Sequence, residues 1–403
     1  MSESLPLSGI RVVEFTHMVM GPTCGMILAD LGAEVIKVEP LSGDNTRKLM
    51  GSGAGFFPMF NRNKKSLAVD VKTEAGRELV LRLIQTADVF SENFKSGTMD
   101  KLGFGEKALA ALNPSLIYVS HKGFLPGPYE NRTALDEVVQ MMGGLAYMTG
   151  PEGRPLRAGS SVNDIMGGMF GAIGVLAALH ERNKTGKGHT VKSALFENNV
   201  FLVAQHMMQY AVTGKAAAPM PSRISAWGIY DVFTVKDDEQ IFLSVVSDTQ
   251  WNIFCDEFGF ADLFADERLT SNNQRVQARQ WLMPLLRERF ADFSAAELSQ
   301  RFEARGLPYA PITRPHDLFD DPHLVATGGL AKMTVPADGS VSAQPIETST
   351  PLMPLEMDGQ RLGVRHDPPA VGASGRQLLA ELGFSEQQID NLRNKGIIEA
   401  PST

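Results

Sequence analysis

The first half of the chain alternates short runs of apolar and β-branched residues with segments of helical periodicity. The apolar runs predict buried strands at 10–15, 34–39, 67–71, 88–92, 116–121 and 190–194. Helical spacing of apolar positions predicts helices at 23–31, 73–86 and 195–212. Strands that alternate with helices in this way are typical of a parallel sheet covered by helices, so we expect an α/β fold.

The pattern changes at 214–221, a stretch of small residues and prolines that predicts a linker. Beyond it we expect a small second domain with a strand at 241–246, helices at 250–259, 276–290 and 295–305, and an extended segment at 308–313. Proline- and glycine-rich sequence at 336–369 then leads to two short helices at 374–382 and 386–395.

Composition narrows the class of protein and of partner. A length of 403 residues suggests two domains, and 38 basic against 46 acidic residues leave a formal net charge of −8. No basic block stands out, so nucleic acid is not an expected partner. Short basic groups such as Arg62, Lys64 and Lys65 suit a small anionic ligand better.

Nothing in the sequence predicts a disulfide framework, a metal site or export. Cys24 and Cys255 lie far apart and have no ligand spacing. The N-terminal residues lack a basic region followed by an apolar core, which predicts no signal peptide. The apolar stretches are interrupted by Gly, Asp or His and look too short to span a bilayer. We therefore expect a cytoplasmic protein that is not bound to a membrane.

The predicted parallel sheet raises the possibility of a dinucleotide-binding protein. Such a protein carries Gly-x-Gly-x-x-Gly after its first strand. Here the segment 16–22 reads Thr-His-Met-Val-Met-Gly-Pro, with a single early glycine. An ordinary dehydrogenase is therefore not expected.

One carboxylate, Asp164, lies at the start of a long apolar helix that contains no other acid before Glu181. Glycines recur along this helix at three- and four-residue spacing, namely Gly167, Gly168, Gly171 and Gly174. Each costs about 1 kcal/mol of helix stability relative to alanine, which indicates a close backbone approach. Asp164 has two interpretations: a helix N-cap, or a nucleophile kept ionised near the positive end of the helix.

Several motifs in a characteristic order resemble the class III coenzyme A transferases, the family that includes formyl-CoA and carnitine-CoA transferases and α-methylacyl-CoA racemase. The motifs are Val-Val-Glu-Phe-Thr-His-x3-Gly-Pro at 12–22, Leu-Ala-Asp-Leu-Gly-Ala-Glu-Val-Ile-Lys-Val-Glu-Pro at 28–40, Asn-Arg-Asn-Lys-Lys-Ser at 61–66, Glu-Asn-Phe-Lys-Ser-Gly at 92–97, and His-Glu-Arg-Asn-Lys-Thr-Gly-Lys-Gly-His at 180–189. The similarity runs along nearly the whole chain.

The resemblance implies an interlocked homodimer of two ring-like chains, each with a split Rossmann-like large domain and a smaller α+β domain. On this basis we divide the chain into the first part of a CoA-binding large domain at 1–213, a linker at 214–228, a small domain at 229–327, and a return linker with the rest of the large domain at 328–403. Close helix packing in such a dimer would explain the glycines after Asp164; packing within one chain would explain them equally well.

By resemblance Asp164 is the catalytic nucleophile. A carboxylate has an ordinary pKa of about 3.9, so it is expected to be ionised at pH 7 without a separate base. It would form a mixed anhydride with the donor acyl group and then a CoA thioester, which the acceptor acid reverses. Oxyanions form in each step, and the expected donors are N–H groups at the start of the Asp164 helix or in a loop at 225–228.

Two other activities remain as alternatives. Racemases of the family pair this aspartate with a histidine, but Leu135 occupies the histidine position, and leucine cannot carry a proton. The neighbouring Asp136 would instead cap a helix running to Tyr147. The second alternative is a catalytically silent acyl-CoA-binding protein, against which the intact Asp164 motif argues.

Relatives contact CoA at positions that correspond here to His17, Lys72, Asn93, Phe94, Lys101, Lys122 and Phe124. CoA would be a substrate, and no tightly bound cofactor is expected. Taken singly, Lys72 and Lys101 could be solvated charges and Phe94 a core residue. Pro40 replaces an arginine that flanks adenine in formyl-CoA transferase, so adenine should stack differently.

The expected substrates are small carboxylic acids. Val19 replaces a glutamine that lies beside the reacting groups in formyl-CoA transferase, which makes oxalate a less suitable acceptor. The segments 121–132 and 223–227 look more like those of transferases for mesaconate, itaconate, citramalate or succinate. A second substrate carboxylate needs a cation, and the candidates are Arg47, Arg132 and Arg223.

Overall fold

A computed structural model describes residues 5–223, 225–337, 342 and 344–400. The chain forms two compact units, Met1–Pro221 with Pro322–Thr403, and Ser222–Asp321. The predicted domain limits at 229 and 327 lie within a few residues of the second unit.

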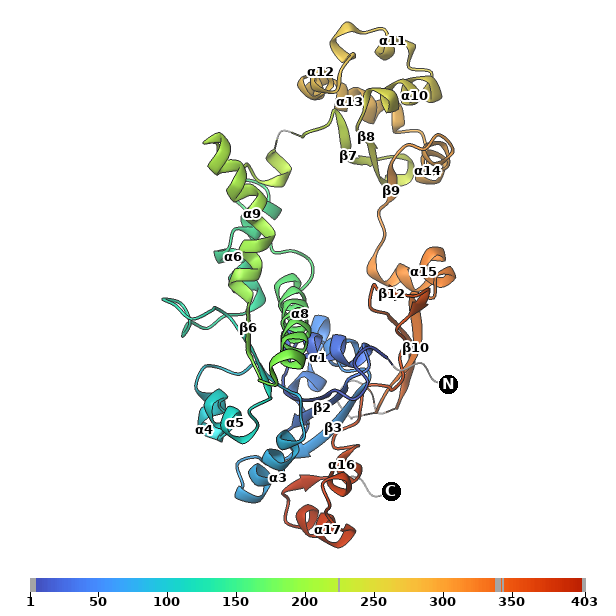
Figure 1. The fold of residues 1–403 in the computed structure, drawn as a ribbon. Coiled ribbons are helices and arrows are strands. Elements are labelled where there is room, and N and C mark those ends of the chain that lie inside the picture. Colours follow the sequence, from blue (N-terminus) through green and yellow to red (C-terminus); the bar gives the residue numbers. More distant parts are fainter. Residues whose placement is uncertain (1–4, 224, 338–341, 343, 401–403) are drawn as a thin grey trace. The chain divides into compact units, whose positions relative to one another are not determined.

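The larger unit is built on a seven-stranded sheet. Its order is β14 (Ile398–Glu399), β3 (Lys64–Val69), β2 (Glu34–Glu39), β1 (Arg11–Phe15), β4 (Val89–Glu92), β5 (Ile117–Lys122), β6 (Thr190–Ala194), and the strands β2, β3 and β6 are labelled in Figure 1. All neighbours pair in parallel except β14, which runs antiparallel to β3. The predicted α/β fold with a mostly parallel sheet is therefore confirmed.

Helices cover both faces of this sheet (Figure 1). Alternate residues of β1 point to opposite faces, so Val12 packs with α1 (Met20–Asp30) and α8 (Val162–Thr185), while Val13 packs with α3 (Glu74–Gln85), α16 (Gly375–Glu381) and α17 (Glu386–Asn394). The remaining helices of the unit include α2 (Phe56–Phe60), α4 (Thr98–Leu102), α5 (Glu106–Leu112), α6 (Asp136–Met142), α7 (Leu145–Thr149), α9 (Leu195–Thr213) and α15 (Pro322–Ala326).

The glycines of α8 pack inside the chain. A Cβ on Gly168 would lie 2.5 Å from Thr23 Cβ of α1, and one on Gly171 would lie 2.4 Å from His121 Cε1 of β5. A Cβ on Gly174 would lie 2.4 Å from Val191 Cγ1 of β6. Of the two interpretations of these glycines, packing within one chain accounts for them.

The predicted long apolar helix after Asp164 is α8, which continues through its glycines for 24 residues. Among the residues described, α8 is long and apolar enough to cross a membrane, with a mean hydropathy of 1.6 over its best window. The expectation that the apolar stretches are too short to span a bilayer is therefore wrong for this helix. That window is 44% buried inside the protein, and core helices meet the same criteria.

The smaller unit has its own antiparallel sheet of β7 (Ile229–Thr234), β8 (Gln240–Val245) and β9 (Tyr309–Pro311). Helices α10 (Asp248–Phe258), α11 (Ala261–Phe264), α12 (Asn272–Gln277), α13 (Arg279–Phe290) and α14 (Ala295–Ala304) complete it. Phe254, Phe290 and Phe302 are fully buried in its core. The single helix predicted at 276–290 is two helices that meet at Ala278.

Two hairpins lie in the return segment: β10 (Leu330–Val335) with β11 (Ile346–Pro351), and β12 (Glu356–Met357) with β13 (Gln360–Arg361). The sequence predicted a proline- and glycine-rich connection here and missed these strands. Both cysteines are buried and unpaired, and no cluster of metal-ligating side chains occurs among the residues described.

Candidate active site at the carboxyl ends of β1, β4 and β5

The strand order reverses between β1 and β4, since β2 and β3 lie on one side of β1 and β4, β5 and β6 on the other. The crevice at the carboxyl ends of such strands is where ligands bind in open parallel sheets. Five of the seven predicted CoA-contacting residues follow these strand ends: His17 after β1, Asn93 and Phe94 after β4, and Lys122 and Phe124 at the end of β5.

Three of these residues touch one another. The Asn93 side chain accepts the His17 N–H at 3.0 Å and donates to the His17 carbonyl at 2.8 Å. The His17 and Phe94 rings lie 5.1 Å apart, and burial lowers the pKa of His17. Asn93 therefore fixes the turn after β1, and the rings of His17 and Phe94 lie side by side at this turn.

Several basic side chains in this part of the fold are buried and paired with acids, and one of them, Lys37, also bonds to the turn after β1. Lys37 donates to the Thr16 carbonyl at 2.5 Å and pairs with Asp44 at 2.8 Å. Lys64 pairs with Glu14 at 2.7 Å, and Arg62 pairs with Asp30. The expectation that the basic group at 62–65 serves a small anionic ligand is therefore wrong for Arg62 and Lys64, whose charges are buried against acids.

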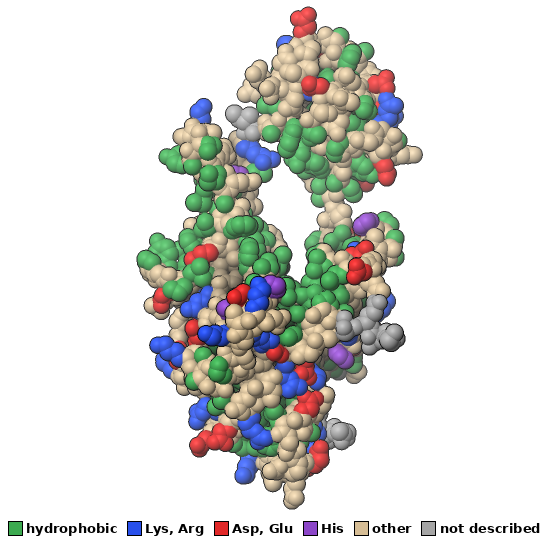
Figure 2. Space-filling view, viewed as in Figure 1, with side chains coloured by type: hydrophobic (Ala, Val, Ile, Leu, Met, Phe, Trp, Pro, Cys, Tyr) green, Lys and Arg blue, Asp and Glu red, His purple; other side chains and the backbone are tan. Residues whose placement is uncertain are grey.

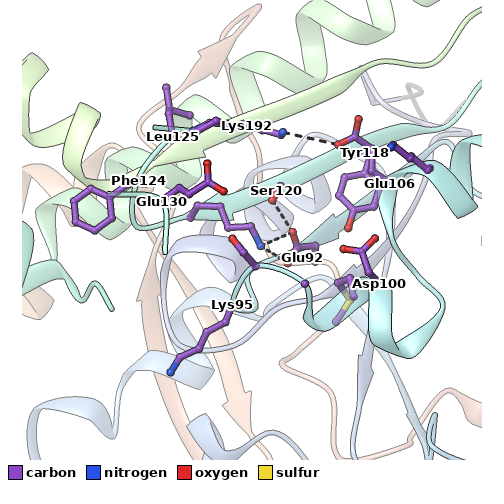
Figure 3. Close-up of a pocket in the computed structure, with 16 residues that line it drawn as sticks. Glu92, Lys95, Asp100, Glu106, Tyr118, Ser120, Phe124, Leu125, Glu130 and Lys192 are labelled. Carbon is purple, nitrogen blue, oxygen red and sulfur yellow. Dashed lines mark hydrogen bonds and ion pairs between the residues drawn. The ribbon is translucent and has the colours of Figure 1, made fainter. Parts of the chain in front are cut away.

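Lys122 spans the ends of β4 and β5. Its ammonium lies 2.8 Å from the Glu92 carboxylate and donates to the Phe94 carbonyl at 2.5 Å. Figure 3 shows Glu92 also accepting from Ser120, at 2.6 Å, in a cavity of about 430 Å³. Phe124 is buried among apolar side chains at the edge of this cavity. Lys122 thus positions Phe94 as well as carrying charge.

Phe94 lines a second, mostly apolar cavity of about 450 Å³. Pro40, Lys72, Phe94 and Leu102 contribute to its lining. Lys101 is exposed on α4, next to Leu102. Its largely apolar lining with one lysine has the polarity that a nucleobase next to a phosphate requires.

The three predicted substrate arginines lie in different places. Arg47 is buried against Glu39, with bonds of 2.9 and 2.7 Å, and stacks on Phe57. Arg132 stacks on Tyr129 and lines a cavity of about 290 Å³ with Asn93 and Lys122. Arg223 belongs to the smaller unit. The ion pair of Arg47 engages its charge, so the structure does not bring Arg47 to a substrate.

Asp164 lies in the first turn of α8, but it does not cap the helix. Ser161 is at the N-cap position, and its side chain makes no capping bond. Asp136 accepts the N–H groups of Asn163, at 2.8 Å, and Asp164, at 3.2 Å. The Asp164 carboxyl makes no hydrogen bond with any residue that the structure describes, so the capping interpretation is wrong and the carboxyl stays available.

Asp136 also departs from its predicted role. It is the first residue of α6, which ends at Met142 and does not continue to Tyr147, because Gly144 has a φ of 89° and separates α6 from α7. The helix that Asp136 caps is α8, which starts 26 residues further along the chain.

The predicted oxyanion donors are largely engaged. At the start of α8, Val162 N–H donates to Ser160, Ile165 N–H to Ser161, and those of Asn163 and Asp164 to Asp136. In the loop 225–228, Trp227 N–H donates to the Ser225 hydroxyl and Gly228 N–H to Asn272.

The pKa of Asp164 differs from the sequence expectation. Burial and the negative charge of Asp136 raise it to about 7, and the positive charge of Arg157 opposes this effect. The positive end of α8 does not keep the pKa of Asp164 low, because the Asp136 carboxylate already accepts the N–H groups of Asn163 and Asp164. The Asp164 carboxyl therefore titrates near neutral pH and not near pH 4.

A stability prediction follows from this pKa. The folded state binds the Asp164 proton more tightly than the unfolded state, so ionising it destabilises the fold progressively from about pH 4 to pH 7. Asp164→Asn should therefore be more stable than wild type at pH 8 by about 2 kcal/mol, half the full electrostatic value because of solvent screening. The gain should nearly vanish below pH 4. Urea unfolding at both pH values measures it; an equal gain at both would contradict the assignment.

A fourth cavity, of about 500 Å³, lies at the start of α8, where Ser161 and Ile165 line it on either side of Asp164 in the sequence. The sequence did not predict this cavity. Val19, Phe56, Phe60 and Ile165 make it apolar, and Arg157 is the cation in its lining. Arg157 opens the same sequence segment that leads to Asp164, which was the available signal. Val19, two residues after His17, also belongs to the lining of this cavity.

The chain matches known proteins along its length. The family model of CoA-transferase family III matches residues 7–375. Succinyl-CoA:glutarate CoA-transferase of Mus musculus is 32% identical, covering 99% of this chain and 91% of its own. Acetyl-CoA:oxalate CoA-transferase of Acetobacter aceti is 34% identical over 81% of this chain and 86% of its own. The crystal structure of a CAIB/BAIF family protein from Brucella suis, 34% identical, superposes with a TM-score of 0.83 over 94% of this chain and 100% of its own. The chain therefore belongs to CoA-transferase family III and is an enzyme that transfers coenzyme A between acyl-CoA and carboxylic acids.

Proposed function

We propose that this enzyme transfers CoA from succinyl-CoA or a similar dicarboxylyl-CoA to a small dicarboxylic acid, through covalent intermediates on Asp164. The observation that carries the proposal is the Asp164 carboxyl: it lies in the first turn of α8, where the next residue, Ile165, lines a largely apolar cavity, and another acid accepts the N–H groups of this turn. A buried carboxyl with a pKa near 7 and no hydrogen-bond partner among the described residues suits a nucleophile better than a structural acid.

The reaction proceeds in four balanced steps. An ionised Asp164 oxygen attacks the thioester carbon, and the C–S bond breaks to give a mixed anhydride and CoA thiolate. The thiolate attacks the Asp164 carbonyl and expels the donor carboxylate, which leaves a CoA thioester on the enzyme. The acceptor carboxylate attacks this thioester to give a new anhydride and thiolate. Attack of the thiolate on the acceptor carbonyl forms the product and restores Asp164.

For CoA we propose the path marked by Phe94. Adenine would occupy the 450 Å³ cavity lined by Pro40, Phe94 and Leu102, and the phosphates would lie near Lys72 and Lys101. The pantetheine arm would pass His17 toward Asp164. Support comes from the contact between His17 and Phe94 and from Val19, which lies two residues after His17 and lines the cavity at the start of α8.

For the acid we propose the cavity lined by Val19, Phe56, Ile165 and Arg157. Its apolar wall suits a short carbon chain, and the Arg157 cation suits a distal carboxylate. Arg157 pairs with Glu137, which is 59% exposed on its side chain, and its Nη2 donates no hydrogen bond to a described residue. Arg157 replaces Arg47 as the preferred cation for the substrate.

Arg157→Gln should weaken dicarboxylate acceptors selectively. Loss of a charge-assisted hydrogen bond of about 1.5–3 kcal/mol should raise the KM for glutarate about 10- to 100-fold. The KM for butyrate, which lacks the second carboxylate, should change less than threefold. An acceptor panel of glutarate, succinate, mesaconate, oxalate and butyrate, scored by newly formed acyl-CoA, measures this. Equal losses for glutarate and butyrate would assign Arg157 a structural role only.

The covalent mechanism is tested by trapping. Wild-type enzyme incubated with succinyl-CoA should gain the mass of CoA less one water, because the CoA sulfur replaces the carboxyl OH. Borohydride should convert the thioester to an alcohol that peptide mapping locates at Asp164. Deuterium exchange at the α-carbon without any acceptor acid, and without an adduct, would support racemisation in place of transfer.

We further propose that the enzyme works as a homodimer. Apolar side chains lie exposed on α9, among them Phe201 at 67% and Val212 at 76%, and Figure 2 shows hydrophobic side chains over this helix. Ile173 of α8 is 56% exposed. Faces of this kind mark interfaces. Sedimentation equilibrium should give twice the chain mass of 43.8 kDa, and a monomer at micromolar concentration would contradict the proposal.

A further inference from the structure

Asp136 makes the contacts that organise the start of α8. Its carboxyl is buried, with 7% exposure, and accepts the N–H groups of Asn163 and Asp164. The Gln140 amide, one turn further along α6, donates to the other carboxyl oxygen. Three donors from two helices therefore converge on this one acid.

Gln140 extends the contact to the segment before α8. It is fully buried, and its carbonyl oxygen accepts the Ala158 N–H at 2.8 Å. This bond orients the amide so that its NH₂ group faces Asp136. The pair of Asp136 and Gln140 thereby holds both ends of the segment 158–164, which includes Asp164 and follows directly on Arg157.

Capping alone does not require a charge at this position. Serine and asparagine cap helices about as well as aspartate, and a buried charge is costly to desolvate. The charge of Asp136 has a second effect, because its carboxylate accepts the N–H of Asp164 at 3.2 Å and raises the pKa of the Asp164 carboxyl. The charged groups that face Asp164 are Asp136 from α6 and Arg157 from the preceding segment; Glu137 of α6 pairs with Arg157.

We propose that Asp136 is a positioning residue that anchors the first turn of α8 and, through its negative charge, sets the pH range in which Asp164 acts as a nucleophile. The inference rests on the proposed role of Asp164. A like charge at close range disfavours ionisation of its neighbour, so the α6–α8 contact keeps part of Asp164 protonated near neutral pH. Removing the charge should extend nucleophilic attack to lower pH.

The test measures the rate of CoA-adduct formation from succinyl-CoA between pH 5 and pH 9 by quenched-flow mass spectrometry. In the wild type the rate should rise with a midpoint near pH 7. Asp136→Asn and Asp136→Ser keep a hydrogen-bond acceptor but lose the charge, and each should move the midpoint down by about one pH unit. Glu152→Gln, which removes an exposed acid close in sequence, should leave it unchanged.

The outcomes separate the two proposals. An adduct that forms in Asp136→Asn and Asp136→Ser with the wild-type midpoint would overturn the role of Asp136 and leave that of Asp164 intact. Absence of any adduct from the wild type would overturn both. Asp136→Ala, which loses the acceptor as well, should lower the plateau rate at least tenfold below that of Asp136→Asn; an equal plateau would contradict the anchoring role. Circular dichroism of each variant shows that it is folded.

Discussion

Asp164→Asn is expected to lower the rate of CoA transfer by at least about 10⁴-fold. Asparagine has nearly the same shape as aspartate, but its amide is not a nucleophile, so both half-reactions lose their first bond-forming step. Losses of this size are typical when a covalent nucleophile is removed. Steady-state transfer from succinyl-CoA to glutarate, followed by chromatography of the acyl-CoA products, measures the loss.

The same variant should also fail to accumulate a CoA adduct. Glu152→Gln serves as the matched control, because it makes the same chemical change at an exposed position and should keep full activity. If Asp164→Asn retained a tenth of wild-type turnover, the covalent mechanism would be wrong, and Asp164 would act only on substrate binding or orientation.

Gly168→Ala is expected to destabilise the protein by about 2 kcal/mol or more, although alanine is the better helix former. The added Cβ would lie 2.5 Å from Thr23 Cβ and 2.6 Å from the Met20 carbonyl oxygen, and backbone atoms cannot move aside as a flexible side chain can. Overpacking typically costs about 1–3 kcal/mol, which outweighs the gain of about 1 kcal/mol in helix propensity. Urea denaturation gives the difference in unfolding free energy.

The control is the opposite change on the same helix. Ala177 is exposed, so Ala177→Gly should cost only the propensity difference of about 1 kcal/mol. Helix α1 starts at Met20, directly after the turn that contains His17. An added Cβ that pushes α8 away from α1 should therefore also reduce the activity of Gly168→Ala. Equal or greater stability of Gly168→Ala would mean that α1 and α8 do not approach as closely as the glycines indicate.

The elements of the large unit were predictable because their signals are local. The strands at 34–39 and 190–194 have the predicted limits, and the other sheet strands shift by a few residues. A buried parallel strand needs a continuous apolar run, which can be read from neighbouring residues alone. The hairpin of β10 and β11 and the strand β14 were missed, because each is defined by a pairing partner and not by its own sequence.

Charged side chains were the least predictable part of the site. Arg47, Arg62 and Lys64 look alike in the sequence, yet each pairs with a buried acid from another element. Asn93 was predicted as a ligand contact, and the structure assigns it the hydrogen bonds that fix His17. Arg157 was missed as a cation of the cavity at the start of α8. Which charge faces a ligand depends on which acids lie close in space.

The sequence by itself determined the α/β class, the family and the identity of the expected nucleophile, because these follow from the order of local patterns and from side-chain chemistry. Only the tertiary structure decided how Asp164 is held. Its N–H bonds to an acid 28 residues away, its carboxyl is left uncommitted, and its pKa rises to about 7. Hydrogen-bond partners, burial and charge–charge distances are properties of the folded chain, since they depend on which distant segments meet.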